Sequence, residues 1–163
     1  MEIKRVNYED LTAITNLVEA VSKVAVLPYF NDQGKQEYIA RVLPDIKMTL
    51  DNDNFVSVKA VSNDALLGFA AMRAGNYLTH LFVSHQAQRQ GIGRKLLQHL
   101  LDSTDAQEIK LRSAVNSVDC YLKCGFEITD QEGEFNGIRF VPMSLIKSKS
   151  HKSIYKERAC QAL

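Results

Sequence analysis

The chain has 163 residues, a length that suits one domain and allows a substantial buried core. Apolar residues make up 45% of the sequence and charged residues 24%, proportions that exclude wholesale disorder. The 20 basic residues nearly balance the 19 acidic ones, so overall charge gives no argument for a nucleic-acid or membrane-surface partner.

The N-terminal residues and the cysteines together predict a cytoplasmic protein. The opening MEIKRVNYEDL lacks the apolar core of a signal peptide, and the longest apolar stretches fall short of the ~20 residues that cross a bilayer. Cys120, Cys124 and Cys160 form no disulfide framework, and no His or Cys pair elsewhere completes a zinc site. We therefore expect reduced thiols and no metal.

The first third of the chain has the pattern of one strand followed by two helices. Ile3–Val6 is expected to be a short strand, and a capping-box pattern at Asn7 precedes apolar residues at helical spacing. This spacing predicts a helix from Tyr8 to Val24. A second helix is expected to begin near Gln33 and to be kinked or restarted at Pro44.

From Phe55 onward the apolar period changes to two, which predicts an antiparallel meander. Its three strands are expected at Phe55–Val61, Ala65–Ala74 and Tyr77–Val83. The later elements are expected to be a helix at Gly91–Ser103, a strand at Ile109–Ala114, a helix at Ser117–Cys124, and strands at Phe126–Thr129 and Ile138–Leu145. This order predicts a mixed sheet with helices on its faces.

Residues 1–146 contain no repeat and no linker, so we expect them to form one domain. The remaining residues, 147–163, are basic and rich in Ser and Lys. Two interpretations of this segment remain open: a solvated tail, or a helix that binds a partner or a second copy.

The segment QRQGIGRKLLQHLL, which starts at Gln88, places two glycines and several cations where a helix begins. The first turn of a helix presents backbone N–H groups that lack partners, together with the positive end of the dipole. Gly91 and Gly93 remove side chains that would keep a ligand away from this backbone. The segment therefore predicts a site for a phosphate or pyrophosphate.

Two well-known phosphate loops do not match this segment. A Walker loop requires G-x-x-x-x-G-K-[ST], but Leu96 follows Lys95 and the glycine spacing differs. A Rossmann loop requires a third glycine at position 96 and a parallel βαβ unit, whereas this loop follows a meander.

Gln88–Gly93 matches the pattern Q/R-x-x-G-x-G/A and resembles the acyl-CoA loop of the GNAT superfamily of N-acetyltransferases. YLTHLFV followed by SHQAQRQGIGRKLL is similar to the fourth strand, pyrophosphate loop and third helix of that family. VNSVDCYLKCGFE resembles its fourth helix with a Y-x-x-x-GF ending, and GIRFVPMSL resembles the closing strand of many bacterial members. The resemblance covers Met1 to about Ile146 in the family's order.

The resemblance implies an α/β (α+β) fold with a mixed, mostly antiparallel sheet of about six or seven strands and about four helices. Strands four and five would splay apart at a bulge and leave a slot for pantetheine. The implied activity is transfer of an acetyl group from acetyl-CoA, as cosubstrate, to a primary amine by direct attack through a tetrahedral intermediate, without a metal. The acetyl-CoA-binding residues implied in this way are Leu81, Phe82, Val83, Gln88, Arg89, Gln90, Gly91, Ile92, Gly93, Arg94 and Asn116.

Tyr121 aligns with the tyrosine that protonates the departing CoA thiolate in many family members. A phenol near pKa 10 can supply a proton to a thiolate whose thiol has a pKa near 8.5. The alternative is a tyrosine that packs and hydrogen-bonds locally. For Asn116, capping of the fourth helix is the alternative to a CoA contact, and Ser113 is another polar candidate at this turn because Ala114 occupies the family's usual asparagine position.

The general base is the least determined part of the site. His80 is the titratable residue on the fourth strand with a useful pKa, but regular alternation points it away from the face of Leu81 and Val83. A strand bulge would re-aim it. A structural histidine, or an acceptor amine deprotonated in solution, are the other options.

The acceptor is expected to be a small-molecule amine or a protein amino group, and the resemblance places its entry beside the loop that holds Tyr29 and Phe30. These aromatic residues either line an acceptor pocket or pack as a lid. No nucleic acid or membrane partner is expected, and a homodimer is one of the expected states. The competing functions are a non-catalytic acyl-CoA-binding or regulatory module and a scaffold that binds partners through its tail.

Overall fold

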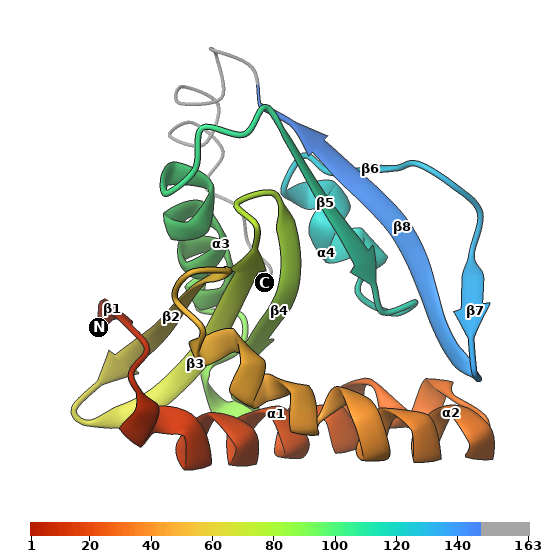
Figure 1. Cartoon of the computed structure of the whole chain (residues 1–163), viewed down its shortest axis with the longest axis horizontal. Coiled ribbons are helices and arrows are strands. Elements are labelled where there is room, and N and C mark those ends of the chain that lie inside the picture. The colour runs from red at the N-terminus through yellow and green to blue at the C-terminus, as the bar shows by residue number, and fades with distance from the viewer. Residues whose placement is uncertain (148–163) are drawn as a thin grey trace.

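The computed structural model describes residues 1–147 and contains a central sheet with helices on both faces (Figure 1). The strands pair in the order β1-β2-β3-β4-β5-β8-β6, and β7 pairs with β8 at the far end. β4 and β5 are parallel, and the other described pairs are antiparallel. The strands are β1 Glu2–Arg5, β2 Phe55–Ser62, β3 Ala65–Arg73, β4 Tyr77–Val83, β5 Glu108–Ser113, β6 Glu127–Ile128, β7 Gly133–Phe135 and β8 Ile138–Ile146.

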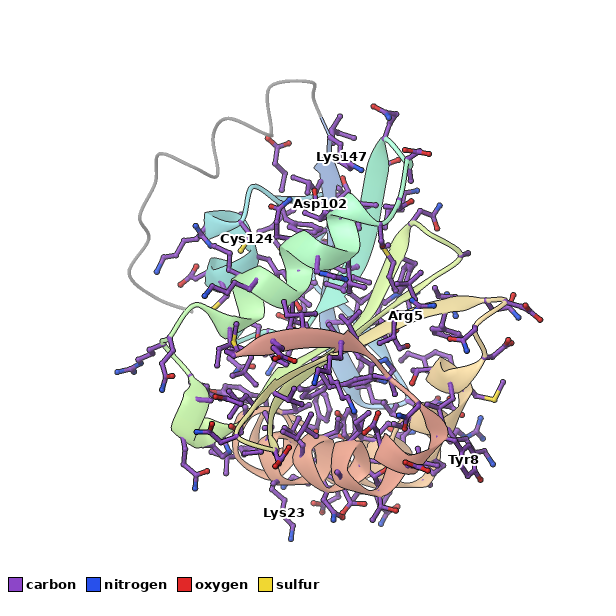
Figure 2. All side chains as sticks on the ribbon, turned by 90° about the vertical axis from the view of Figure 1, so that its left-hand side faces the viewer. Arg5, Tyr8, Lys23, Asp102, Cys124 and Lys147 are labelled. Carbon is purple, nitrogen blue, oxygen red and sulfur yellow. The ribbon has the colours of Figure 1, made fainter. Side chains whose placement is uncertain are left out.

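The helices divide between the two faces of the sheet. They are α1 Leu11–Ala25, α2 Asp32–Glu37, α3 Ile92–Asp102 and α4 Val118–Lys123. Ile14 and Val18 of α1 pack with Phe69 on one face, whereas Leu96 and Leu100 of α3 pack on the other. Figure 2 shows α1 and α3 on opposite sides of the strands. The predicted mixed sheet with about four helices is therefore confirmed.

α1 belongs to the core of the domain. The segment Tyr8–Tyr29 is long and apolar enough to cross a membrane by length and composition alone. Its buried residues recur at helical spacing, however, and this apolar stripe covers the sheet. The predicted capping box is present, because the backbone N–H of Asn7 donates to Oδ2 of Asp10 at 2.9 Å.

The segment after α2 departs from regular α-helix. A π-helical turn covers Tyr38–Val42, and a 3-10 turn begins at Pro44, which cannot continue the helical hydrogen bonding. The Tyr38 hydroxyl lies 2.8 Å from Oγ of Ser22 on α1, and both side chains are buried. This hydrogen bond fixes the π-helical turn against the C-terminal half of α1.

The strand β7 was not predicted from the sequence. Phe135 pairs with Ile138 across a two-residue turn in which Asn136 has φ 49° and Gly137 has φ 83°. Both angles are left-handed, as in a type I′ hairpin, for which Asn-Gly is the preferred pair. The signal was therefore in the sequence, as EFNGIRF. Within residues 1–147 the sheet has eight strands, including the short β7, against the predicted number of about six or seven.

The described chain ends beside α3. Nζ of Lys147 donates to the carbonyl oxygen of Leu101 at 2.9 Å, so a cation lies at the C-terminal end of that helix, where the dipole is negative. The expected tail, 147–163, lies outside the described residues except for Lys147.

Candidate active site

The central opening of the site arises where β4 and β5 part. The two strands pair only at Tyr77 with Lys110 and at Leu78 with Leu111, although β4 continues to Val83 and β5 to Ser113. The second half of β4 therefore has no neighbouring strand on the β5 side (Figure 1), where the carbonyl of Val83 accepts from Nε2 of Gln88 at 3.1 Å. This is the splay that the sequence resemblance implied.

The loop between β4 and α3 ends in backbone geometry that favours glycine. Gly91 has φ 76° and Arg89 has φ 62°. The first hydrogen bond of α3 runs from the N–H of Lys95 to the carbonyl of Gly91 at 3.1 Å. The N–H groups of Ile92, Gly93 and Arg94 therefore have no acceptor within the helix, which is the arrangement that the predicted anion site requires.

One cavity lies between this loop, the free half of β4 and α4. Its volume is about 340 Å³. The expected cosubstrate-binding residues in its wall are Leu81, Phe82, Val83, Gln88, Arg89, Gly93 and Asn116. The wall also includes Val21 and Ala25 of α1 and residues in and next to α4: Ser117, Cys120, Tyr121, Lys123 and Cys124. The structure thus gathers residues that are far apart in the sequence around one cavity.

Other expected cosubstrate residues have structural contacts of their own. Gln90 donates to the carbonyl of Gln86 at 3.2 Å, and the side chain of Ile92, the first residue of α3, is buried in the core. The guanidinium of Arg94 donates to the carbonyl of Lys123 at 3.2 Å and so ties α3 to the end of α4. Gly91 and these three residues lie outside the cavity wall.

Asn116 and Ser113, the two polar residues near α4 that were expected to contact CoA, differ in whether they reach the cavity. Asn116 is exposed and lines the cavity, and Ser117 rather than Asn116 is the N-cap residue of α4. Oγ of Ser113 is buried and donates to the carbonyl of Ala114 at 2.8 Å, outside this cavity wall. Of the two, Asn116 is the one placed to contact a ligand.

A second cavity lies on the other side of Tyr121, toward α1 and the β7–β8 hairpin. Its volume is about 400 Å³, and it shares Leu81, Phe82 and Tyr121 with the first cavity. Phe30 lines it and is 7% exposed, whereas Tyr29 is 43% exposed and lies outside the wall. Of the two aromatic residues expected at the acceptor entry, only Phe30 therefore has its side chain in the cavity.

Tyr121 stands where the two cavities meet. Its ring packs edge-on against Phe126, with centroids 5.6 Å apart. Burial raises the pKa of the phenol well above its ordinary value, and the nearby thiols of Cys124 and Cys120 raise it further. The phenol therefore carries its proton at neutral pH, as a proton donor must.

A bulge in β4 determines where His80 points. Ala71 pairs with His80 and Met72 pairs with Leu78, so Thr79 is an extra residue on β4. The bulge places Leu78 and His80 on opposite faces: Leu78 is in the core beneath α3, and His80 lies between the rings of Phe69 and Phe82. Regular alternation is thus broken, and His80 lines the second cavity.

The hydrogen bonds of Thr79 specify the tautomer of His80. The Thr79 hydroxyl lies 3.0 Å from the carbonyl of Ala71, which can only accept, so the hydroxyl proton is used there. Nδ1 of His80 lies 2.9 Å from the same hydroxyl and must therefore donate to it. The lone pair of the neutral ring is then on Nε2.

Burial lowers the pKa of His80 to about 4, so the ring is neutral at physiological pH. The unfolded chain binds this proton with an ordinary pKa near 6.5, and the folded chain binds it only near 4. Between these values the unfolded state holds more protons, so acidification destabilises the fold. We expect the free energy of unfolding to fall by roughly 3 kcal/mol between pH 7 and pH 4 because of His80.

Urea unfolding at a series of pH values measures this loss. His80→Asn should remove the His80 component between pH 7 and pH 4, whereas His99→Asn, at an exposed position on α3, should retain it. Equal pH dependence in the wild type and His80→Asn would show that His80 titrates normally in the folded protein.

The sequence did not point to several wall residues of the two cavities. Val21 and Ala25 contribute to both cavities because the C-terminal end of α1 crosses the open half of β4. Arg112 and Arg139 come from β5 and β8 and line the second cavity. A helical stripe and strand alternation show which side of an element is buried, but they do not identify the partner, so these residues carried no distinctive signal.

Comparison with known proteins identifies the family. A family model described as acetyltransferase (GNAT) domain matches residues 26–147, which is most of the chain. No match was found among curated proteins.

Solved structures of similar fold point the same way. The PaiA N-acetyltransferase from Thermoplasma acidophilum, in complex with coenzyme A, superposes with a TM-score of 0.70 at 19% identity, covering 90% of this chain and 98% of that one. An aminoglycoside 6'-N-acetyltransferase complexed with coenzyme A superposes with a TM-score of 0.67 at 15% identity, covering 90% of this chain and 97% of that one. A ribosomal-protein-alanine N-acetyltransferase from Brucella melitensis superposes with a TM-score of 0.62 at 16% identity, covering 90% of this chain and 100% of that one. With its family model, splayed sheet and glycine-bearing helix start, the chain belongs to the GNAT family of acetyltransferases.

Proposed function

We propose that the protein transfers the acetyl group of acetyl-CoA to the nitrogen of a primary amine. The observation that carries this proposal is the position of Tyr121, whose side chain lines both cavities at their junction. A binding module needs only a cosubstrate pocket. A transferase needs two pockets that meet at a proton donor, and this arrangement has that form.

The residues present suit coenzyme A. The free half of β4 offers backbone groups to an extended pantetheine chain, as an added strand would use them. The unpaired N–H groups at the start of α3 would offer an anion site for the pyrophosphate, with Gly93 and the side chain of Arg89 in the cavity wall beside them. Gly93 lies in the cavity wall, where an added Cβ would meet only Val83, at an ordinary contact distance of 3.5 Å.

The chain's own groups supply the proton transfers. Acetyl-CoA brings an activated acyl group, and Tyr121 would donate a proton to the departing sulfur. Nε2 of His80 would accept a proton from the attacking nitrogen, whose acidity rises as the new bond forms. With a pKa of about 4, His80 serves only this late transfer and does not deprotonate a free ammonium ion, so the amine enters as its neutral form.

A thiol-release assay with acetyl-CoA and a panel of amines tests the proposal, with calorimetric titration of acetyl-CoA as the companion measurement. We expect binding at one site and amine-dependent release of CoA. Binding without turnover on any amine would favour the alternative function, a non-catalytic acyl-CoA-binding or regulatory module. Absence of binding would contradict both and leave the scaffold interpretation.

The anion site makes a prediction of its own for Arg89. Arg89→Glu replaces a cation in the cosubstrate wall by an anion, so we expect the Kd for CoA to rise roughly 10- to 100-fold through loss of a charge-assisted contact and added repulsion. Titration calorimetry at low and physiological salt measures the change, which should shrink as salt screens the charges.

Lys23→Glu is the matched control for Arg89→Glu. Lys23 lies on α1 and points away from the sheet (Figure 2), so the same charge reversal there should leave the Kd unchanged. Equal Kd values for the wild type and Arg89→Glu would place the pyrophosphate elsewhere.

We also propose that the enzyme works in the cytoplasm, where acetyl-CoA and reduced thiols are available, on a small-molecule amine or a protein amino group. A homodimer remains one of the expected assembly states, to be decided by light scattering at several concentrations.

A further inference from the structure

The charge of the second cavity is one-sided. Among the described residues that line it, the ionic side chains are Arg112 and Arg139, and no Asp or Glu is present. His80 is neutral at physiological pH because its pKa is about 4. Much of the rest is apolar or aromatic, including Phe30, Phe135 and Phe140. An ion entering this cavity therefore meets positive charge on an apolar wall.

The two arginines differ in how far they are already neutralised. Nε of Arg139 lies 2.6 Å from Oε1 of Glu132, and its Nη1 donates to the carbonyl of Tyr29 at 3.4 Å. The guanidinium carbon of Arg112 lies 4.3 Å from the centroid of the Phe140 ring. Within residues 1–147, the side chain of Arg112 makes no ion pair and no hydrogen bond.

Stacking on Phe140 holds the Arg112 guanidinium in place without using its in-plane N–H groups. Planar N–H pairs of this kind match a carboxylate in a bidentate arrangement. The backbone then leads from Arg112 to Ala114, Ser117 and Tyr121, all of which line the same cavity. A carboxylate at Arg112 and an amine near Tyr121 would thus both lie within one cavity.

We propose that the acceptor is a small amine that also carries a carboxylate and an apolar or aromatic group, that is, an amino-acid-like molecule held at its carboxylate by Arg112. This inference rests on the proposed acetyl transfer. It disfavours polycations: an aminoglycoside, the class in the names of several structural neighbours, would bring further ammonium groups next to unneutralised guanidinium charge.

A matched set of acceptors tests the proposal: phenylalanine, phenylalaninamide and phenethylamine share ring and amine and differ at the carboxylate. We expect kcat/KM, expressed per concentration of free amine, to be roughly 10- to 100-fold higher for phenylalanine, the range of a charge-assisted hydrogen-bond pair. In Arg112→Gln this ratio should fall to near one. Equal values for the three acceptors in the wild type, or a preference for spermidine, an aminoglycoside or a dipeptide amide, would overturn the proposal.

A thermal-shift measurement with CoA present gives a readout that needs no turnover. Phenylalanine should raise the Tm of the wild type more than phenethylamine does, and this difference should vanish in Arg112→Gln. Carboxylate-selective binding without acetylation would contradict the proposed enzymatic function and leave the ligand class standing. Acetylation without carboxylate selectivity would contradict the ligand class and leave the function standing.

Discussion

Tyr121→Phe should lower kcat roughly 100-fold or more while leaving the Kd for CoA within about twofold, because a positioned general acid contributes on that scale. The substitution removes one oxygen and keeps the ring, so the edge-on contact with Phe126 remains. The phenol carries its proton across the working range since burial raises its pKa. Steady-state kinetics with the best acceptor of the panel, together with CoA titration, measure both quantities.

The control for this variant is Tyr77→Phe. Tyr77 lies at the paired start of β4, outside both cavity walls, and its ring stacks under Arg73 with the guanidinium carbon 5.1 Å from the centroid. Loss of its hydroxyl should leave kcat unchanged. If Tyr121→Phe were as active as Tyr77→Phe, Tyr121 would be a packing residue and the departing thiolate would leave without its help.

Gly34→Ala should destabilise the fold by about 3 kcal/mol, the upper part of the range for overpacking in a rigid contact. A Cβ at Gly34 would lie 2.1 Å from the carbonyl oxygen of Gly137, so the β7–β8 turn or α2 would have to move. Gly34 lies in α2, where alanine normally stabilises relative to glycine by roughly 1 kcal/mol. Gly34→Ala is therefore expected to destabilise the fold, whereas helix propensity alone would predict that it stabilises the fold.

Thermal unfolding measures this effect, and roughly 3 kcal/mol corresponds to a fall in Tm of about 10 °C for a chain of this size. Gln36→Ala, at an exposed position of the same helix, is the matched control and should change Tm little. The β7–β8 hairpin contributes Phe135 and Phe140 to the wall of the second cavity. A shift of this hairpin in Gly34→Ala should therefore also raise the KM for the amine, whereas the Kd for CoA should stay unchanged. An unchanged or higher Tm would mean that the contact between α2 and the hairpin is not maintained in solution.

Much of the fold could be predicted because its signals are local. β4 has the predicted bounds, Tyr77–Val83, and α3 begins and ends within one residue of the prediction, since its apolar stripe is strong. The glycine loop follows the same logic, because a helix start presents unpaired N–H groups wherever it occurs. β7 was missed although Asn136-Gly137 is a strong hairpin pair, because its strand is only three residues long.

The parts that could not be predicted depend on contacts across the chain. The face of His80 follows from one extra residue at Thr79, and nothing in YLTHLFV distinguishes a bulged strand from a regular one. Val21 enters both cavities because α1 crosses the splay, and Arg112 meets the Phe140 ring only through the pairing of β5 with β8. Register and packing, not local pattern, set these positions.

The central claim, acetyl transfer to an amine through Tyr121, is tested most directly with acetyl-CoA that carries an isotopic label in its acetyl group. After incubation with phenylalanine and the purified chain, mass spectrometry should find the label in the amide product in amounts equal to the CoA released, and Tyr121→Phe should form this product roughly 100-fold more slowly. Label that stays entirely on CoA across the whole amine panel, while CoA still binds, would contradict the account.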